Sequence, residues 1–425
     1  MVGKLITDMA RSIGEAGWPA LKRAAGTAVR FVPVPQPTLL VGPGSSLRLA
    51  ASLAAFGHRR VLLVTDRELV RLGHVAPFVA ALKATGVAAV VFDRVLPDAP
   101  IPVIEAGMAR LAAGRCDAVV ALGGGSVIDA AKVIALASAD GRPPRELAGW
   151  FRARRAPRPL YVVPTTAGTG SEVTVAAVIA DTDPPRKLTV VDTRLVPTMA
   201  ALDAALMTGL PPAITAATGM DALTHAVEAF IGGWATAATD RLALAAVRTI
   251  WTELPKAVAD GSDLAVRERM ALASCWAGQA FTRASVGNVH ALAHALGAWY
   301  HVPHGLANAM LLPGALRFSL PAAADRLEAL AQAVGVPGGD TVARAEAFCD
   351  AVQGLADRLG IPRHCDALRE ADLPVLAAQA CREADLNYPV PRRMSPADAE
   401  ALLRALRPAD EPSPRRRRRA AAAAG

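Results

Sequence analysis

The chain has 425 residues, of which 52% are hydrophobic, and a formal net charge of +8. A chain of this length exceeds the size at which one core keeps growing, so we expect two domains. Five positive charges belong to Arg415–Arg419 near the C-terminus, and the remaining +3 does not provide the basic face that a nucleic-acid partner requires.

Residues 1–35 are predicted to form an N-terminal extension. Asp8, Arg11 and Glu15 interrupt it where a signal peptide needs an apolar stretch. No run in the chain approaches the roughly 18 apolar residues of a membrane span. The five cysteines are widely spaced and include no CxxC pair, so they indicate neither a disulfide framework nor a thiolate zinc site. We therefore expect a cytoplasmic protein that contacts no membrane.

Residues 36–207 are predicted to form an α/β domain. Short apolar runs alternate with helical stretches, and continuous apolar runs are typical of a parallel sheet covered by helices on both faces. The runs that predict strands are VLLVT at 61–65, AAVVF at 88–92, DAVVAL at 117–122, LYVVPT at 160–165 and AAVIA at 176–180.

A glycine run follows the third of these strands, in DAVVALGGGSVIDAAK. Gly123, Gly124 and Gly125 permit close approach of the backbone, and a following helix would present its N–H groups to a phosphate. Ser126 and Asp129 have the spacing of a capping box. A dinucleotide pyrophosphate fits such a loop, although the GxGxxG fingerprint is absent and a simple tight turn is the alternative.

Two further segments of this domain are candidates for cofactor contacts. VPTTAGTGSEVT at 163–174 follows an apolar strand and gathers hydroxyl groups around two glycines. Ligands of open α/β sheets lie at the carboxyl ends of the strands, which is where this loop would lie. Asp66 ends another strand, where a carboxylate would bind an adenosine ribose and repel a 2′-phosphate.

Residues 208–407 contain almost no strand-like run and are predicted to form an all-helical domain. We place the boundary near residues 205–212. Residues 408–425 are a low-complexity basic tail that we expect to be disordered and solvated.

Five metal-capable side chains fall in the helical domain. Asp221 and His225 are four residues apart, which on a helix places both on one face, and His290 and His294 repeat that spacing. His304 follows in YHVPHG, where Pro303 and Gly305 allow the chain to turn back. Packed or surface histidines are the alternative, but the crowding favours a site for zinc or ferrous iron.

Taken together and in this order, GGGSVIDAAK, PTTAGTGSEVT, the Asp221/His225 pair and HALAHALGAWYHVPHG resemble the iron-containing, group III alcohol dehydrogenases. The resemblance covers roughly residues 36–407. It implies a Rossmann-like parallel sheet in an α/β domain and an all-helical C-terminal domain, the architecture also found in dehydroquinate synthase. A cleft between the domains would hold NAD(P) and one divalent metal.

The resemblance also implies roles for single residues. The metal ligands would be Asp221, His225, His290 and His304, with iron preferred over zinc. His294 would lie beside the metal and the nicotinamide as the catalytic residue. Asp66 implies NAD in preference to NADP. The implied cofactor contacts are Asp66, Gly124, Gly125, Ser126, Asp129, Thr165, Thr166, Thr169, Lys187 and His294.

The chain departs from the family pattern at several points. The usual Asn-Pro-Arg is stretched to NYPVPR at 387–392, and PDAP at 97–100 and Asp203-Ala204 replace other common motifs. Arg283 stands where the family commonly has asparagine. If Arg283 faces the cleft, it favours an anionic substrate, and a surface arginine near a helix end is the alternative.

The implied reaction interconverts an alcohol and an aldehyde or ketone by hydride transfer, with the metal acting as a Lewis acid. His294 would relay the proton, with His301 as the weaker candidate. Alternatives on the same fold are a polyol dehydrogenase, a hydroxyacid–oxoacid transhydrogenase and a dehydroquinate synthase-like lyase. A non-catalytic metal- or nucleotide-binding protein is the alternative from another class. We expect small-molecule substrates, no nucleic acid and a homo-oligomer.

Overall fold

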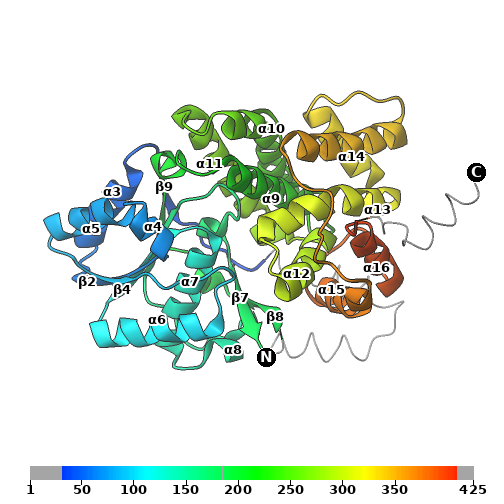
Figure 1. Cartoon of the computed structure of the whole chain (residues 1–425). Coiled ribbons are helices and arrows are strands. Elements are labelled where there is room, and N and C mark those ends of the chain that lie inside the picture. Colours follow the sequence, from blue (N-terminus) through cyan, green and yellow to red (C-terminus); the bar gives the residue numbers. More distant parts are fainter. Residues whose placement is uncertain (1–30, 184, 409–425) are drawn as a thin grey trace, which may run out of the picture.

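The computed structural model describes residues 31–183 and 185–408. The N-terminal part contains the strands and the C-terminal part is helical, and the two parts lie side by side (Figure 1). Residues 1–30 of the predicted extension and residues 409–425 of the predicted disordered tail lie outside the described residues.

The main sheet has six strands, all parallel as predicted. Four of them match the predicted apolar runs, whereas the strands at 38–41 and 199–202 were not predicted. All six residues of strand β4 (Ala118–Gly123) are buried, because helices cover both faces of the sheet and leave neither exposed to water. In sheet order the strands are β1 (Thr38–Val41), β9 (Met199–Leu202), β6 (Leu160–Pro164), β4 (Ala118–Gly123), β2 (Arg60–Val64) and β3 (Ala88–Phe92).

Neighbouring residues of strand β2 pack on opposite faces of this sheet. Leu63 of β2 packs with Leu49 of helix α3 (Ser45–Ala55) and with Phe78 of helix α5 (Val75–Ala84). Leu62 packs instead with Ile104 and Ile128, which belong to α6 and α7. Figure 1 shows α5 and α6 on opposite sides of β2 and β4. The helices of this part are α3 (Ser45–Ala55), α4 (Arg67–Arg71), α5 (Val75–Ala84), α6 (Ile101–Gly114), α7 (Gly125–Asp140) and α8 (Pro144–Leu147).

A second, three-stranded sheet contains β5 (Gly149–Trp150), β7 (Ala176–Thr182) and β8 (Pro185–Val191). The prediction that 176–180 joins the parallel sheet is wrong, since β7 pairs antiparallel with β8. Only two residues separate these strands, whereas a parallel pair needs a crossover of a dozen residues or more. The burial of β7 also alternates, as expected for a sheet with one open face.

The change from strands to helices falls between the end of β9 at Leu202 and the start of α9 at Pro212. Pro212 occupies the first turn of α9, where its missing N–H costs nothing. From there to residue 408 the described chain is helical apart from its connections. Its helices are α9 (Pro212–Ile231), α10 (Ala237–Ala259), α11 (Leu264–Ala284), α12 (Asn288–Tyr300), α13 (His304–Ala333), α14 (Thr341–Arg358), α15 (Leu373–Asn387) and α16 (Pro396–Arg404).

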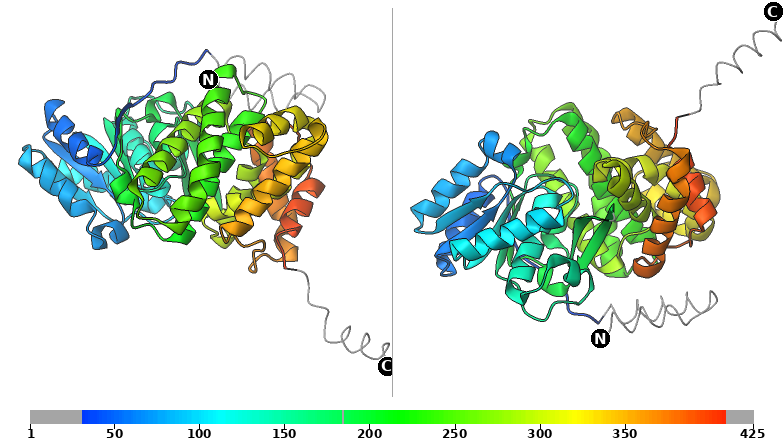
Figure 2. Two further views of the ribbon diagram at one scale, coloured as in Figure 1. Left: turned by 90° about the horizontal axis from the view of Figure 1, so that it is seen from above. Right: turned by 60° about the horizontal axis from the view of Figure 1, so that its bottom comes forward.

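Short 3-10 turns complete the fold: η1 (Ser171–Val173), η2 (Thr193–Leu195), η3 (Ala204–Met207) and η4 (Glu370–Asp372). Helix α11 contacts η1 and β9, and α12 contacts β8, so the helical part packs directly against the first part of the chain (Figure 2). Within the described ranges, no helix combines the length and the apolar character that a membrane crossing requires.

Candidate metal and cofactor site

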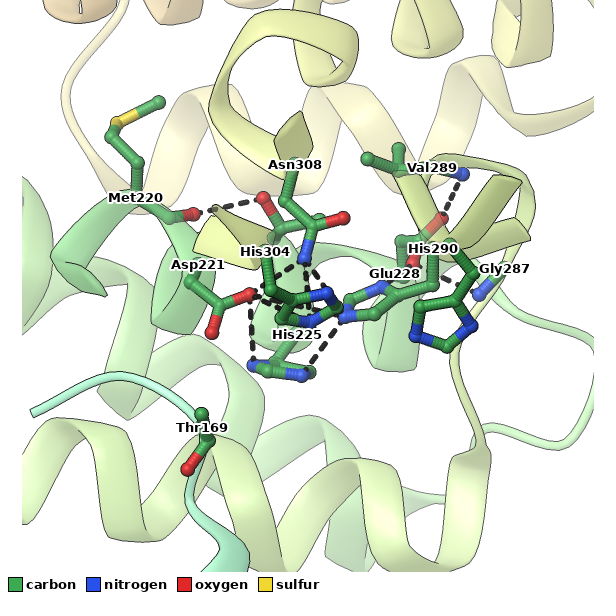
Figure 3. A network of polar contacts seen from close by, with 12 residues as sticks. Thr169, Met220, Asp221, His225, Glu228, Gly287, Val289, His290, His304 and Asn308 are labelled. Atoms are coloured by element: carbon green, nitrogen blue, oxygen red, sulfur yellow. Dashed lines mark hydrogen bonds and ion pairs between the residues drawn. The ribbon is translucent and has the colours of Figure 1, made fainter. Parts of the chain in front are cut away.

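Four predicted ligands converge from three helices. Asp221 and His225 lie on α9, His290 on α12 and His304 at the start of α13. One ligand atom from each lies within 4.8 Å of the others. The Oδ1 atom of Asp221 is 3.6 Å from His304 Nε2 and 4.0 Å from His290 Nε2. Figure 3 shows the four side chains pointing toward one another.

The electrostatics of this cluster suit a cation. Burial lowers the pKa of His225 and His290, and it lowers the pKa of His304 to about 4, so the three imidazoles are neutral near pH 7. Two of their nitrogens, Nε2 of His225 and Nε2 of His290, face each other at 2.9 Å. Three neutral imidazoles and one carboxylate are a donor set that fits zinc or ferrous iron.

Two buried polar residues that the sequence analysis missed complete the cluster. Glu228 accepts hydrogen bonds from the backbone N–H groups of Gly287 and Val289, and it lies 2.6 Å from Nδ1 of His290. Burial raises the pKa of Glu228 to about 8. Asn308 Nδ2 donates to Asp221 Oδ1 at 2.7 Å. Their spacing, three residues after His225 and four after His304, was the available signal, because it places them on the same helix faces.

His294 lies beside the cluster rather than in it. Its ring is stacked on that of His304, with centroids 5.2 Å apart, and its Nδ1 contacts Glu383 Oε1 at 2.6 Å. The group of four converging ligand atoms does not include it. The spacing alone offered five candidate ligands, and the geometry separates His294 from the other four.

A cavity of about 760 Å³ opens beside the cluster, between the two parts of the chain. It is lined by His225, His290, His294 and His304 and by residues of the two predicted cofactor loops, the glycine loop at 123–126 and the threonine loop at 163–174. Arg283 also lines it, and so do the apolar side chains of Trp150 and Phe281. The predicted cofactor residues that line it are Gly125, Ser126, Asp129, Thr169, Lys187 and His294.

The glycine loop begins α7 as predicted, but the predicted capping box is wrong. The residue that precedes the helix is Gly124, and no side chain caps it. Ser126 Oγ instead accepts from the N–H of Asp98 at 3.1 Å. Asp129 accepts from Ser171 Oγ at 2.6 Å and from the N–H of Val178 at 2.8 Å. Both side chains therefore make tertiary contacts in place of the local cap.

The two cofactor loops pack directly on each other. A Cβ atom at Gly125 would lie 2.5 Å from the Cγ2 atom of Thr169, which is closer than side chains approach. The N–H of Thr165 donates to the carbonyl of Gly123 at 3.1 Å. Glycine at 125 thus allows the contact and leaves the helix start open to the cavity. Gly124, Thr165 and Thr166 belong to these loops but do not line the cavity.

Two predicted cofactor residues have other contacts. Lys187 of β8 lies in the cavity wall and forms an ion pair with Asp98. Asp66 follows β2, which pairs with β4 in the sheet. The Oδ1 atom of Asp66 accepts a hydrogen bond from the N–H of Leu69, so Asp66 caps the N-terminus of α4. Asp66 does not line the cavity.

Comparison with known proteins agrees with this arrangement. Residues 36–204 match the model of the iron-containing alcohol dehydrogenase family, and residues 215–407 match the model of the C-terminal part of the Fe-containing alcohol dehydrogenase family. A 1,3-propanediol dehydrogenase of Klebsiella pneumoniae is 38% identical over 369 residues, which cover 85% of this chain and 95% of that protein.

Two further proteins extend the comparison. An NAD-dependent methanol dehydrogenase of Bacillus methanolicus is 35% identical, covering 82% of this chain and 92% of its own length. The solved structure of an alcohol dehydrogenase from Oenococcus oeni superposes with a TM-score of 0.85 at 33% identity, covering 88% of this chain and 99% of that one. The chain therefore belongs to the iron-containing alcohol dehydrogenase family.

Proposed function

We propose that this protein is an NAD-linked, metal-dependent alcohol dehydrogenase that interconverts a small alcohol and its aldehyde or ketone. The observation that carries the proposal is the convergence of one carboxylate and three neutral imidazoles beside a cavity that also contains the glycine loop. A metal site and a dinucleotide site facing one cavity are what hydride transfer to or from an activated carbon–oxygen bond requires.

Asp221, His225, His290 and His304 are the residues that would hold the divalent ion, iron in preference to zinc. Such an ion would supply Lewis-acid polarisation of the substrate oxygen. The protein holds these ligands before binding, because Glu228 orients His290 and Asn308 contacts Asp221.

The start of α7 and the threonine loop are the segments that would hold NAD. Gly125 and Ser126 line the cavity at the N-terminus of α7, and the unpaired backbone N–H groups of a helix N-terminus favour a pyrophosphate. Thr169 and Lys187 line the same wall. Asp66 lies at the end of the adjacent strand and would favour NAD over NADP, as the NAD-dependent relative would also suggest.

His294 is the protein group placed to accept or return the proton of the substrate hydroxyl. Its ring lines the cavity and contacts His304, so it lies next to the atoms that would bind the substrate oxygen. An imidazole ring can both accept and donate a proton, which suits this role. His301 is a poorer candidate, because it ends α12 with an exposed side chain outside the cavity lining.

The proposal is tested by metal analysis of the purified protein together with an anaerobic screen of aldehydes, polyols and hydroxy acids, followed by nicotinamide absorbance. We expect a bound divalent ion and net oxidation of NADH with small aldehydes. Binding of NADH without turnover on any member of the panel would overturn the proposal. A lyase that uses NAD catalytically would likewise produce no net change in NADH.

A further inference from the structure

Glu383 reaches the cavity from α15, 89 residues after His294 in the chain. Its Oε1 lies 2.6 Å from Nδ1 of His294, and the two side chains are 14% and 5% exposed. The hydroxyl of Tyr388 donates to the same oxygen. All three residues line the cavity, so this contact lies at the site rather than on the outer surface.

The contact decides which nitrogen of His294 is available to a ligand. An ionised carboxylate can only accept hydrogen bonds, so the proton of a neutral His294 resides on Nδ1. The lone pair then belongs to Nε2. Within the described part of the chain, no hydrogen bond to Nε2 of His294 is formed, while the ring itself is held against His304 at an interplanar angle of 28°.

We propose that Glu383 is a positioning residue that fixes the orientation and tautomer of His294, and that Tyr388 in turn fixes Glu383. This inference rests on the proposed function, in which Nε2 of His294 exchanges a proton with the substrate hydroxyl. A histidine base whose second nitrogen contacts a carboxylate is held for the reaction instead of rotating in the cavity.

The sequence around Tyr388 is also unusual for the family. Tyr388 belongs to NYPVPR, where the sequence departs from the usual family motif, and Glu383 precedes it by five residues. Tyr388 follows the end of α15 at Asn387, and its side chain is 6% exposed. The departure therefore places a buried hydroxyl against the carboxylate that contacts His294.

The test compares Glu383→Ala with Glu383→Gln in steady-state turnover of a small aldehyde with NADH. Loss of a residue that orients a ligand or base typically costs 10–100-fold, so we expect kcat of Glu383→Ala to fall about 30-fold. KM, metal content and NADH affinity should stay near their wild-type values. Glutamine retains an oxygen that accepts from Nδ1–H, so Glu383→Gln should recover most of kcat.

A matched control is Asp385→Asn, which neutralises a carboxylate of the same helix that forms an ion pair with Arg393 outside the cavity lining. This variant should keep wild-type kinetics. Tyr388→Phe should lower kcat less than Glu383→Ala does, since it removes only the support of the carboxylate.

A double variant isolates the coupling to His294. If Glu383 acts through His294, adding Glu383→Ala to His294→Ala should change kcat by less than about twofold. Independent, multiplying losses would overturn the inference, and so would wild-type kcat in Glu383→Ala. Loss of metal in Glu383→Ala would also overturn it, by making the residue structural. Absence of turnover in the wild-type protein would instead contradict the proposed function.

Discussion

At the scale of single residues, the candidate site combines proposed metal ligands, which the sequence predicts, with neighbouring polar residues that it does not predict. The spacing of Asp221, His225, His290 and His304 is readable along the chain, because helix geometry converts four-residue steps into one face. Glu383 was not predictable in this way. Its partner His294 lies 89 residues away, and only packing of α15 against α12 brings the two together.

Asp66 offers a test of cofactor choice. We expect Asp66→Gly to narrow the preference for NADH over NADPH, since the 2′-phosphate would no longer meet a carboxylate. Because Asp66 also caps α4, Asp66→Asn is the better variant: asparagine can still accept from the N–H of Leu69 while removing the charge. The ratio of kcat/KM for NADH to that for NADPH measures the effect. An unchanged ratio in both variants would show that Asp66 does not contribute to cofactor choice.

Arg283 offers a test of substrate class. It lines the cavity, and among the described residues it forms no ion pair, so an anionic group on the substrate could bind it. A charge-assisted hydrogen bond contributes about 2 kcal/mol, or roughly 30-fold. We expect Arg283→Gln to lower kcat/KM by about that factor for an aldehyde with a terminal carboxylate. Butanal, the uncharged comparison, should be little affected. Equal losses for both aldehydes would contradict a role in charge recognition.

At the scale of elements, local sequence patterns predict most strands, the loops and the helical domain. Strand pairing and side-chain hydrogen bonds depend on tertiary contacts, which those patterns do not predict. The apolar run at 176–180 looks like the other strands, but only its pairing partner β8 makes it antiparallel. Ser126 and Asp129 have capping spacing, yet Asp98, Ser171 and Val178 bind their side chains. Such competition between local and distant partners is not visible in one segment of sequence.

Substitution of Lys132 tests how α7 is held beside the threonine loop at 163–174. It is fully buried, and its ammonium donates to the carbonyl and hydroxyl of Thr174 and to the carbonyl of Ala176, all within 2.9 Å. Burial lowers the pKa of Lys132 to about 8. Lys132→Ala leaves these oxygens without their donor, so we expect the free energy of unfolding to fall by about 3 kcal/mol.

Urea unfolding followed by circular dichroism measures this loss. The control is Lys83→Ala, because Lys83 is an exposed residue of α5 and its replacement should cost less than about 0.5 kcal/mol. Equal midpoints for the two variants would show that Lys132 does not hold α7 in place.

At the scale of the whole molecule, the site exists only when the two parts of the chain are folded and in contact. The proposed ligands come from α9, α12 and α13, and residues of the two predicted cofactor loops, which belong to the first part of the chain, line the same cavity. An ion that binds only the folded chain stabilises it by mass action. The stability of the helical part should therefore depend on the metal.

Metal removal tests this dependence. A chelator should lower the melting temperature, and added Fe²⁺ or Zn²⁺ should restore it, since an ion at 100 times its Kd contributes about 2.7 kcal/mol. His294→Ala should respond as the wild-type protein does, because His294 is outside the ligand group. If neither the chelator nor the added ion changed the melting temperature, the cluster of Asp221, His225, His290 and His304 would not be a metal site.

The most direct measurement of the central claim is the metal content of purified wild-type protein, His290→Ala and His304→Ala, determined together with their NADH-linked activity. We expect about one divalent ion per chain in the wild type, and loss of both metal and activity in each variant, because each removes one of four ligands. A fully active, metal-free variant would contradict the account.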